Sequence, residues 1–416
     1  MTQLRSLALT HPSYGDMAAT LPSLTGLTKL VLNEVDFDSQ RRTLKPSLFT
    51  ALHNLRSLEL SVDNMHVEDL EQLTALTHLF AGLVAKEPRR PLTIAPVWPM
   101  PPRLRSLTFH GSEIDIGVLG CLQLPQCLER VACDDDELEI ELTYGVHTDP
   151  DGRLLPAMEG ALANALDLLA RARDEPVVDG EPPAEDWPGY SVGIVFDNDD
   201  SDEFVMLRPQ AGGLVGAAAG ADAALPRGHL PWLEALAAVR PAELNLENIM
   251  LDEADLRCIA GMTSLKALSF EDGKPSFPVG ALPLLGILPR LGRLELCTRP
   301  LVRQPQEEVA QAIKRLCTAA APRRLDVVLK PYDGISDDSD DDDSDDDDSG
   351  DGDSDDDEYW GGTRGHASND DEQSQALLAR VNGLLGGAGL APGMVRLEAR
   401  SLRAFTWSGV NMTVGA

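Results

Sequence analysis

The chain of 416 residues is 43% hydrophobic and 25% charged, and it carries a formal net charge of −33 at pH 7. This excess of acid disfavours binding to nucleic acid or to an anionic membrane surface, because both need clustered Lys and Arg side chains. No apolar run is long enough to span a membrane. The six cysteines form no Cys-x-x-Cys pair, which favours reduced thiols in an intracellular protein over a disulfide framework or a zinc site.

Leucines at a fixed spacing mark a series of short predicted strands. In the clearest copy, over residues 55–60, Leu55, Leu58 and Leu60 occupy positions one, four and six. We expect these leucines to point into one core while the residues between them face outward. Copies of the pattern begin at Leu4, Leu27, Leu55, Leu76, Leu104 and Leu128 and return at Leu265 and Leu291. A unit of this kind cannot bury its apolar face alone, so the copies are expected to stack.

The pattern Leu-x-x-Leu-x-Leu resembles the leucine-rich-repeat family. The resemblance implies an α/β solenoid, a horseshoe with a parallel sheet along its concave side, here interrupted by insertions. It also implies a protein that works by binding partners along that concave face. The family usually has an asparagine at position nine, where its side chain bonds neighbouring backbone; here Asn64 and Asn248 lie one residue away from that position.

Composition and periodicity divide the chain into five segments. These are leucine-rich repeats in 1–146, an insertion in 147–229, further repeats in 230–332, a disordered acidic tract in 333–372, and a C-terminal helix and strands in 373–416. Within the insertion we predict a helix over 154–173, an acidic linker, a hairpin that pairs 191–196 with 204–207, and a flexible Gly/Ala run. A strand of period two over 137–142 ends the first block of repeats. A helix over 307–319 and a strand over 325–329 end the second.

The acidic tract is the strongest compositional feature. Residues 337–358 contain fifteen Asp and one Glu with no basic residue, so they carry −16 of the net charge. Such a segment cannot fold alone, and it is either a solvated insertion or a low-specificity site for basic protein segments. Residues 345–356 partly match an EF-hand loop, which predicts weak calcium binding at most. Three serines have Asp three residues later, as acidophilic kinases prefer, and are candidate phosphorylation sites: Ser339, Ser344 and Ser354.

Residues that alternate with the core leucines are the candidates for partner binding, because they face outward along the concave sheet. They are small and neutral in the first block and become acidic in the second, which favours a basic partner. The candidate partner-binding residues are Ser57, Glu59, Ser61, Thr108, His110, Glu243, Asn245, Glu247, Glu271, Arg293 and Glu295.

One motif of enzymes occurs, Gly-x-Ser-x-Gly at residues 189–193. A nucleophile elbow needs a strand before its serine and a helix after it, whereas here prolines precede Ser191 and an apparent strand follows. His229 and His366 are candidate bases, but both fall in predicted loops, where single histidines are usually solvated. The sequence has no phosphate-binding loop, zinc-protease pair or dinucleotide fingerprint. We therefore expect no enzymatic activity and no cofactor.

Together these features predict a non-catalytic scaffold that binds other proteins with basic segments on its concave face, while the Asp-rich tract adds electrostatic capture. Two alternatives stay open: a substrate-recognition adaptor of a ubiquitin-ligase complex, and an acidic protein of the histone-chaperone or calcium-buffer type. We expect a cytoplasmic protein. The family resemblance also implies a cytoskeletal or ciliary-axoneme location, and the nucleus is a further alternative.

Overall fold

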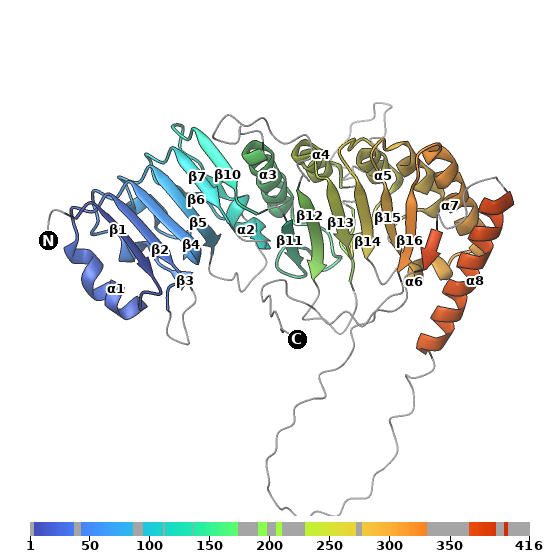
Figure 1. Ribbon diagram of the computed structural model, residues 1–416, viewed down its shortest axis with the longest axis horizontal. Helices are drawn as coiled ribbons and strands as arrows, with labels where there is room; N and C mark the ends of the chain where they lie inside the picture. Colours follow the sequence, from blue (N-terminus) through green and yellow to red (C-terminus); the bar gives the residue numbers. More distant parts are fainter. Residues whose placement is uncertain are drawn as a thin grey trace, which may run out of the picture.

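The computed structural model describes residues 4–36, 43–85, 95–110, 113–135, 137–173, 190–197, 205–209, 229–271, 277–330, 366–387 and 395–397. In this part the chain forms an α/β fold built on parallel sheets. Along each of the two main sheets the strands lie in the order of the sequence, so the fold extends from β1 at one end to β17 and α8 at the other (Figure 1). The acidic tract, its three serines, its calcium-like loop, the acidic linker and the Gly/Ala run lie outside the described residues.

The first sheet contains the strands that the leucine spacing predicts. Its seven described strands are all paired in parallel, and the fourth-position residues of successive copies are partners, as in Leu7, Leu30 and Leu58. The strand order is β1 (Ser6–Thr10), β2 (Lys29–Asn33), β4 (Ser57–His66), β5 (His78–Val84), β7 (Ser106–Phe109) and β10 (Arg130–Cys133), with β3 (Thr43–Leu44) on β4. Nearby, β6 (Trp98–Pro99) and β9 (Leu122–Gln123) form a separate pair.

The second sheet has eight described strands, again all paired in parallel. The period-two strand predicted over 137–142 is confirmed as β11, and the strand predicted over 325–329 as β16. Their order along the sheet is β8 (Glu113–Asp115), β11 (Glu137–Thr143), β12 (Ser191–Asp197), β13 (Glu243–Glu247), β14 (Ala267–Glu271), β15 (Arg293–Cys297), β16 (Asp326–Lys330) and β17 (Val395–Leu397).

The predicted hairpin of 191–196 with 204–207 is wrong. Strand β12 lies between β11 and β13 and is parallel to both. Leu207 instead forms an isolated bridge with Ile249, and Arg208 forms one with Arg153. The reason is that Val192, Ile194 and Phe196 are fully buried in the common core, where a strand inside a sheet buries more apolar surface than an isolated hairpin. The segment predicted as an insertion therefore supplies a strand to the sheet.

Helices cover one face of the second sheet. In Figure 1, α3, α4, α5 and α7 follow one another along the same side, and neighbours in this row are in contact, with the 3-10 helix η4 between α5 and α7. The helices predicted over 154–173 and 307–319 are confirmed as α3 and α7, and the C-terminal helix predicted in 373–416 is confirmed as α8, which begins earlier, at His366. The helices are α1 (Tyr14–Thr20), α2 (Ile116–Leu119), α3 (Pro156–Arg173), α4 (Leu230–Val239), α5 (Glu253–Ala260), α6 (Thr298–Val302), α7 (Gln306–Ala320) and α8 (His366–Gly387), with 3-10 turns η1 (Leu21–Ser23), η2 (Pro46–Leu48), η3 (Leu70–Gln72) and η4 (Val279–Ile287).

A repeated pair of backbone bonds fixes where each strand begins. The N–H groups of Thr28 and Lys29 both donate to the carbonyl oxygen of Arg5, at 2.8 and 3.0 Å. One strand further, Arg56 and Ser57 donate in the same way to Thr28, at 2.9 and 3.1 Å. Each strand is thus held in register with its predecessor before its first leucine, which keeps the core positions aligned.

Several strands end in the same backbone turn. His11, Glu34 and Asn248 are each the first residue after a strand, and each has a left-handed backbone with φ of 50°, 53° and 57°. Asparagine tolerates this conformation better than most residues. The side-chain amide of Asn248 donates to the carbonyl oxygen of Phe196, 3.2 Å away in the preceding strand. It therefore bonds neighbouring backbone even though it lies one residue from the expected position.

All six cysteines lie among the described residues, and none forms a disulfide. Within the described ranges there is no helix both long enough and apolar enough to cross a membrane.

Candidate binding surface

The surface that brings most of the predicted binding residues together is the face of the second sheet opposite its leucine core. We call it the open sheet face and define it as the residues of β11–β16 that alternate with the buried core residues. Along β11, β12 and β13 these alternate residues are exposed or half-buried. Strand register lines them up in two rows: Glu139, Gly193, Asn245, Ser269 and Glu295 in one, and Glu141, Val195, Glu247 and Glu271 in the other.

A charged network occupies the end of this face on β14–β16. The ammonium group of Lys330 bonds a carboxylate oxygen of Glu271 at 2.8 Å and pairs directly with Glu295. Glu295, which is 8% exposed, also pairs with Arg293. The hydroxyl of Ser269 donates to Glu271 at 3.1 Å and approaches Glu295 at 3.4 Å. Two of the predicted acids are therefore tied to bases within the same sheet.

This network shifts the pKa values of its members in the directions expected for ion pairs. Burial alone would raise the pKa of Glu295, but bonds and charges from Lys330 and Arg293 outweigh it and hold that pKa below its ordinary value. Burial alone would lower the pKa of Lys330, but Glu271 and Glu295 together raise it. At neutral pH both groups are charged, so the β14–β16 end of the face is close to neutral.

The pKa of Glu247, which lies next to this network, is raised, whereas that of Glu295 is lowered. Burial raises its pKa, and the negative charges of Glu271, Glu139 and Asp197 raise it further, to about 7, against a smaller opposing effect of Lys330. These carboxylates come from four successive strands, β11 to β14. The middle of the open sheet face therefore holds more negative charge than its own bases balance.

An unfilled acceptor lies in the same region. The side-chain oxygen of Asn245 is buried and accepts a hydrogen bond from no group among the described residues. An unpaired buried acceptor is costly, and because this oxygen has almost no accessible surface, it is not a contact point for a partner.

The predicted residues of the first sheet form no comparable cluster. Glu59 pairs with Lys29 at 3.6 Å. The ring of His110 stacks on Phe80 with centroids 5.3 Å apart, and its Nε2 donates to the carbonyl oxygen of Leu60 at 2.7 Å. Ser57 and Thr108 are half-buried in neighbouring rows. Ser61 lies in β4 at the register shift between Glu59 and Asn64, and its side chain is outside the described residues.

Three charged residues that act on Glu247, Glu271 or Glu295 were not among the predicted binding residues: Lys330, Asp197 and Glu139. Lys330 follows the predicted strand by one position, and Asp197 was assigned to the turn of the hairpin. Only the parallel pairing of β11 with β12 and β12 with β13 brings Glu139 and Asp197 next to Glu247. The alternation of acidic residues in β11 was visible in the sequence, but its place in the second sheet was not.

Two residues of the enzyme-like motif, Ser191 and Gly193, are outward positions of β12 on the open sheet face. Ser191 is the first residue of β12 and pairs with Glu137 and Glu243, which is a strand position and not a strand-to-helix turn. The prediction that His229 lies solvated in a loop is wrong: it is 3% exposed, just before α4. Its Nε2 donates to the carbonyl oxygen of Met250 at 2.9 Å, and burial lowers its pKa to about 4. In the described ranges, no three metal-ligating side chains converge.

The raised pKa of Glu247 predicts a measurable pH dependence of stability. An ordinary Glu titrates near 4.5 and Glu247 near 7, so between these pH values the folded state binds more protons than the unfolded state. Stability therefore falls as pH rises from about 4.5 to about 7, and stays lowered above that. We expect Glu247→Gln to raise the free energy of unfolding at pH 8 by about 1 kcal/mol, discounted for partial exposure, and to change it little at pH 5.

Urea unfolding at pH 5 and pH 8 measures this difference. Glu243→Gln is the matched control, because Glu243 is exposed at the start of the same strand. An equal gain for Glu247→Gln at both pH values would contradict the assigned cause.

Comparison of the sequence with models of known protein families and with curated proteins gives no match.

Proposed function

We propose that this chain is a leucine-rich-repeat protein whose parallel sheets line the concave side of a solenoid, and that it acts as a non-catalytic scaffold for other proteins. Its partner is a protein segment rich in Lys and Arg that lies along the open sheet face. The parallel pairing of successive strands and the register of their leucines support the repeat assignment. Parallel-sheet faces of such repeats form extended concave binding surfaces.

The observation that carries the proposed partner is the unbalanced charge around Glu247. Burial raises the pKa of Glu247 and its negatively charged neighbours raise it further, to about 7, so the ionised form is costly without a nearby cation. A Lys or Arg from a partner would supply the missing positive charge and N–H donors for the carboxylate oxygens on this face. The carboxylates on β14–β16 are already paired with Lys330 and Arg293. We therefore centre the proposed contact on β11–β13, where Glu139 and Glu247 form no ion pair with a base in the described part of the chain.

This proposal predicts that binding is linked to proton release. A cation beside Glu247 lowers the pKa of that carboxyl group, so at pH 7, where Glu247 is about half protonated, binding releases up to about half a proton. For the same reason we expect affinity for a nine-residue oligolysine peptide to rise about fivefold from pH 6 to pH 8. Calorimetric titration in two buffers of different ionisation enthalpy measures the released proton.

The experiment compares the whole chain with a variant that lacks residues 337–358, because the acidic tract also attracts oligolysine. In the deletion variant we expect Glu247→Gln combined with Glu139→Gln to weaken binding about tenfold, and Glu243→Gln to change it less. Loss of all binding on deletion of the tract, or no effect of the double substitution in the deletion variant, would refute the open sheet face as the binding surface.

A further inference from the structure

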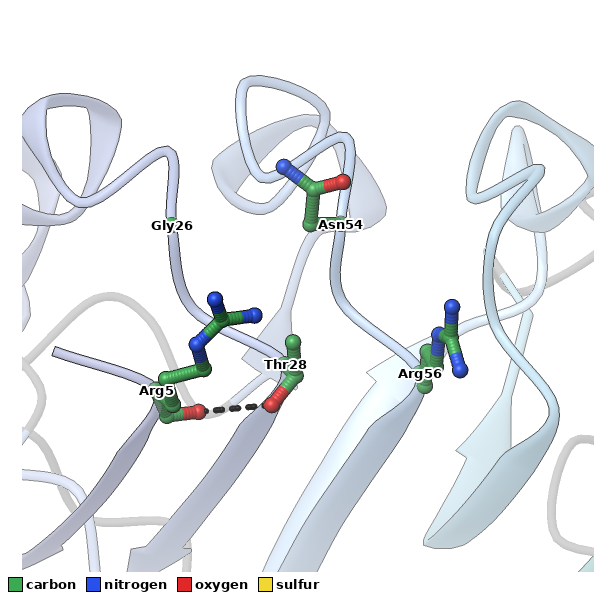
Figure 2. A pocket seen from close by; sticks show the side chains of 5 residues that line it. All are labelled: Arg5, Gly26, Thr28, Asn54 and Arg56. Atoms are coloured by element: carbon green, nitrogen blue, oxygen red, sulfur yellow. Dashed lines mark hydrogen bonds between the residues drawn. The ribbon is translucent and has the colours of Figure 1, made fainter. Parts of the chain in front are cut away.

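A polar pocket lies at the other end of the fold, where the strands of the first sheet begin. Its volume is about 460 Å³, and Arg5, Gly26, Thr28, Asn54 and Arg56 line it. Figure 2 shows the guanidinium group of Arg5 above Thr28, on the side of Gly26 and Asn54, whereas that of Arg56 lies close to the start of β4. The pocket is formed by the equivalent edges of β1, β2 and β4, so its shape follows directly from the repeat.

The charge of this pocket is opposite to that of the chain. None of its five lining residues is acidic, and neither Arg5 nor Arg56 forms an ion pair with a carboxylate in the described part of the chain. Arg105 occupies the corresponding position before β7, but it pairs with Glu129 at 3.5 Å. Arg5, Arg56 and Arg105 all occupy the position before a strand of the first sheet. Of these three, Arg5 and Arg56 have no carboxylate partner among the described residues.

Backbone bonds hold the surroundings of these arginines in place. The carbonyl oxygen of Arg5 accepts bonds from the N–H groups of Thr28 and Lys29 and from the Thr28 hydroxyl, the last at 2.9 Å. The side-chain amide of Asn54 uses one N–H on the carbonyl oxygen of Thr25, at 2.9 Å. Figure 2 shows that this amide nitrogen points toward the loop, away from both guanidinium groups.

We infer that this pocket binds a phosphate group, as carried by a phosphomonoester. Two guanidinium groups without a described counter-charge offer several donors to a small group with multiple charged oxygens, and guanidinium suits phosphate geometry. The overall negative charge of the protein does not prevent this, because at physiological ionic strength charges more than about 8 Å away are largely screened. The inference is independent of the proposed function, since it concerns another sheet and a ligand of opposite charge.

The test uses the full chain in a phosphate-free chloride buffer. Phosphorus NMR line width reports binding of inorganic phosphate, and fluorescence anisotropy reports binding of a labelled phosphoserine peptide. We expect Arg5→Gln and Arg56→Gln each to weaken binding about tenfold. Arg105→Gln is the matched control at the same repeat position and is expected to leave binding unchanged. All three substitutions are at exposed positions, and circular dichroism checks that each variant is folded.

The two probes distinguish the sources of the phosphate group. Arginine-dependent binding of inorganic phosphate supports a site for the free ion, and arginine-dependent binding of the peptide alone supports a site for a phosphorylated protein. Absence of binding by both probes, equal losses in all three variants, or equally tight binding of a peptide with Asp in place of phosphoserine would overturn the inference.

Discussion

Replacing Lys330 by methionine is expected to lower the free energy of unfolding by about 2 kcal/mol at pH 7. The ammonium group of Lys330 is the shared partner of Glu271 and Glu295, and Glu295 is nearly buried. Removal of one partner of a buried ion pair leaves the other charge poorly compensated, which costs about 3–5 kcal/mol when burial is complete. The expected loss is smaller here because Arg293 remains beside Glu295 and the side chain of Glu271 is 38% exposed.

The double variant Lys330→Met with Glu295→Met separates loss of charge balance from loss of packing. If the uncompensated carboxylate is the cause, the second substitution restores most of the lost stability, because an apolar pair of similar volume replaces the ion pair. Arg257→Met, which removes the exposed pair with Glu253 on α5, is the control and should cost less than about 0.5 kcal/mol. Urea unfolding of the four proteins gives the comparison. A double variant that is no more stable than Lys330→Met would rule out this explanation.

The pH dependence of the Lys330 effect follows from the same pair. The pKa of Glu295 lies below its ordinary value of 4.5, so its ionised form contributes stability above that pH, and this contribution is lost as pH falls through the lowered pKa. The raised pKa of Lys330 keeps the amine charged throughout this range. The difference between the original protein and Lys330→Met is therefore largest near neutral pH and shrinks in acid.

Replacing Gly120 by alanine is expected to destabilise the protein by about 3 kcal/mol. Gly120 ends α2 where that helix meets α3, and a Cβ atom at this position would lie 1.9 Å from the carbonyl oxygen of Ala161 and 2.8 Å from its Cα atom. Both atoms belong to backbone, so the added methyl group forces the two helices apart, and overpacking of this kind costs about 1–3 kcal/mol or more. The carbonyl group of Gly120 also accepts a bond from the amide of Asn164 at 3.3 Å, which the same shift would strain.

Gly160→Ala is the matched control for Gly120→Ala. Gly160 is exposed within α3, one residue before Ala161, and a Cβ atom there would meet nothing within 4 Å. Because alanine favours helix over glycine, we expect Gly160→Ala to stabilise the protein by up to about 1 kcal/mol. Opposite signs for the two substitutions would tie the cost at Gly120 to the α2–α3 contact. A cost below about 0.5 kcal/mol at Gly120 would show that this contact relaxes freely.

Residue spacing predicts most of the strands and which side chains of each face inward. Leucines at positions four and six, as in Leu58 and Leu60, can be buried together only on one face of a strand, and both are buried in the structure. Period two over β11 and the helical spacing in α3 and α7 identified those elements for the same reason. The outward residues followed from the inward ones, so Glu247, Glu271 and Glu295 were recognised as members of the exposed face before their neighbours were known.

Tertiary structure alone decided which of these outward residues meet. Side-chain periodicity reports which face a residue occupies but not which strand lies beside it, so the place of β12 between β11 and β13 could not be read from its alternating residues. That placement brings Glu139 and Asp197 beside Glu247, and the register of β16 brings Lys330 to Glu271 and Glu295. The pocket of Arg5 and Arg56 depends likewise on three strands that begin at one edge. Charge interactions act over a few ångströms in space, whereas the residues concerned are separated by tens of positions along the chain.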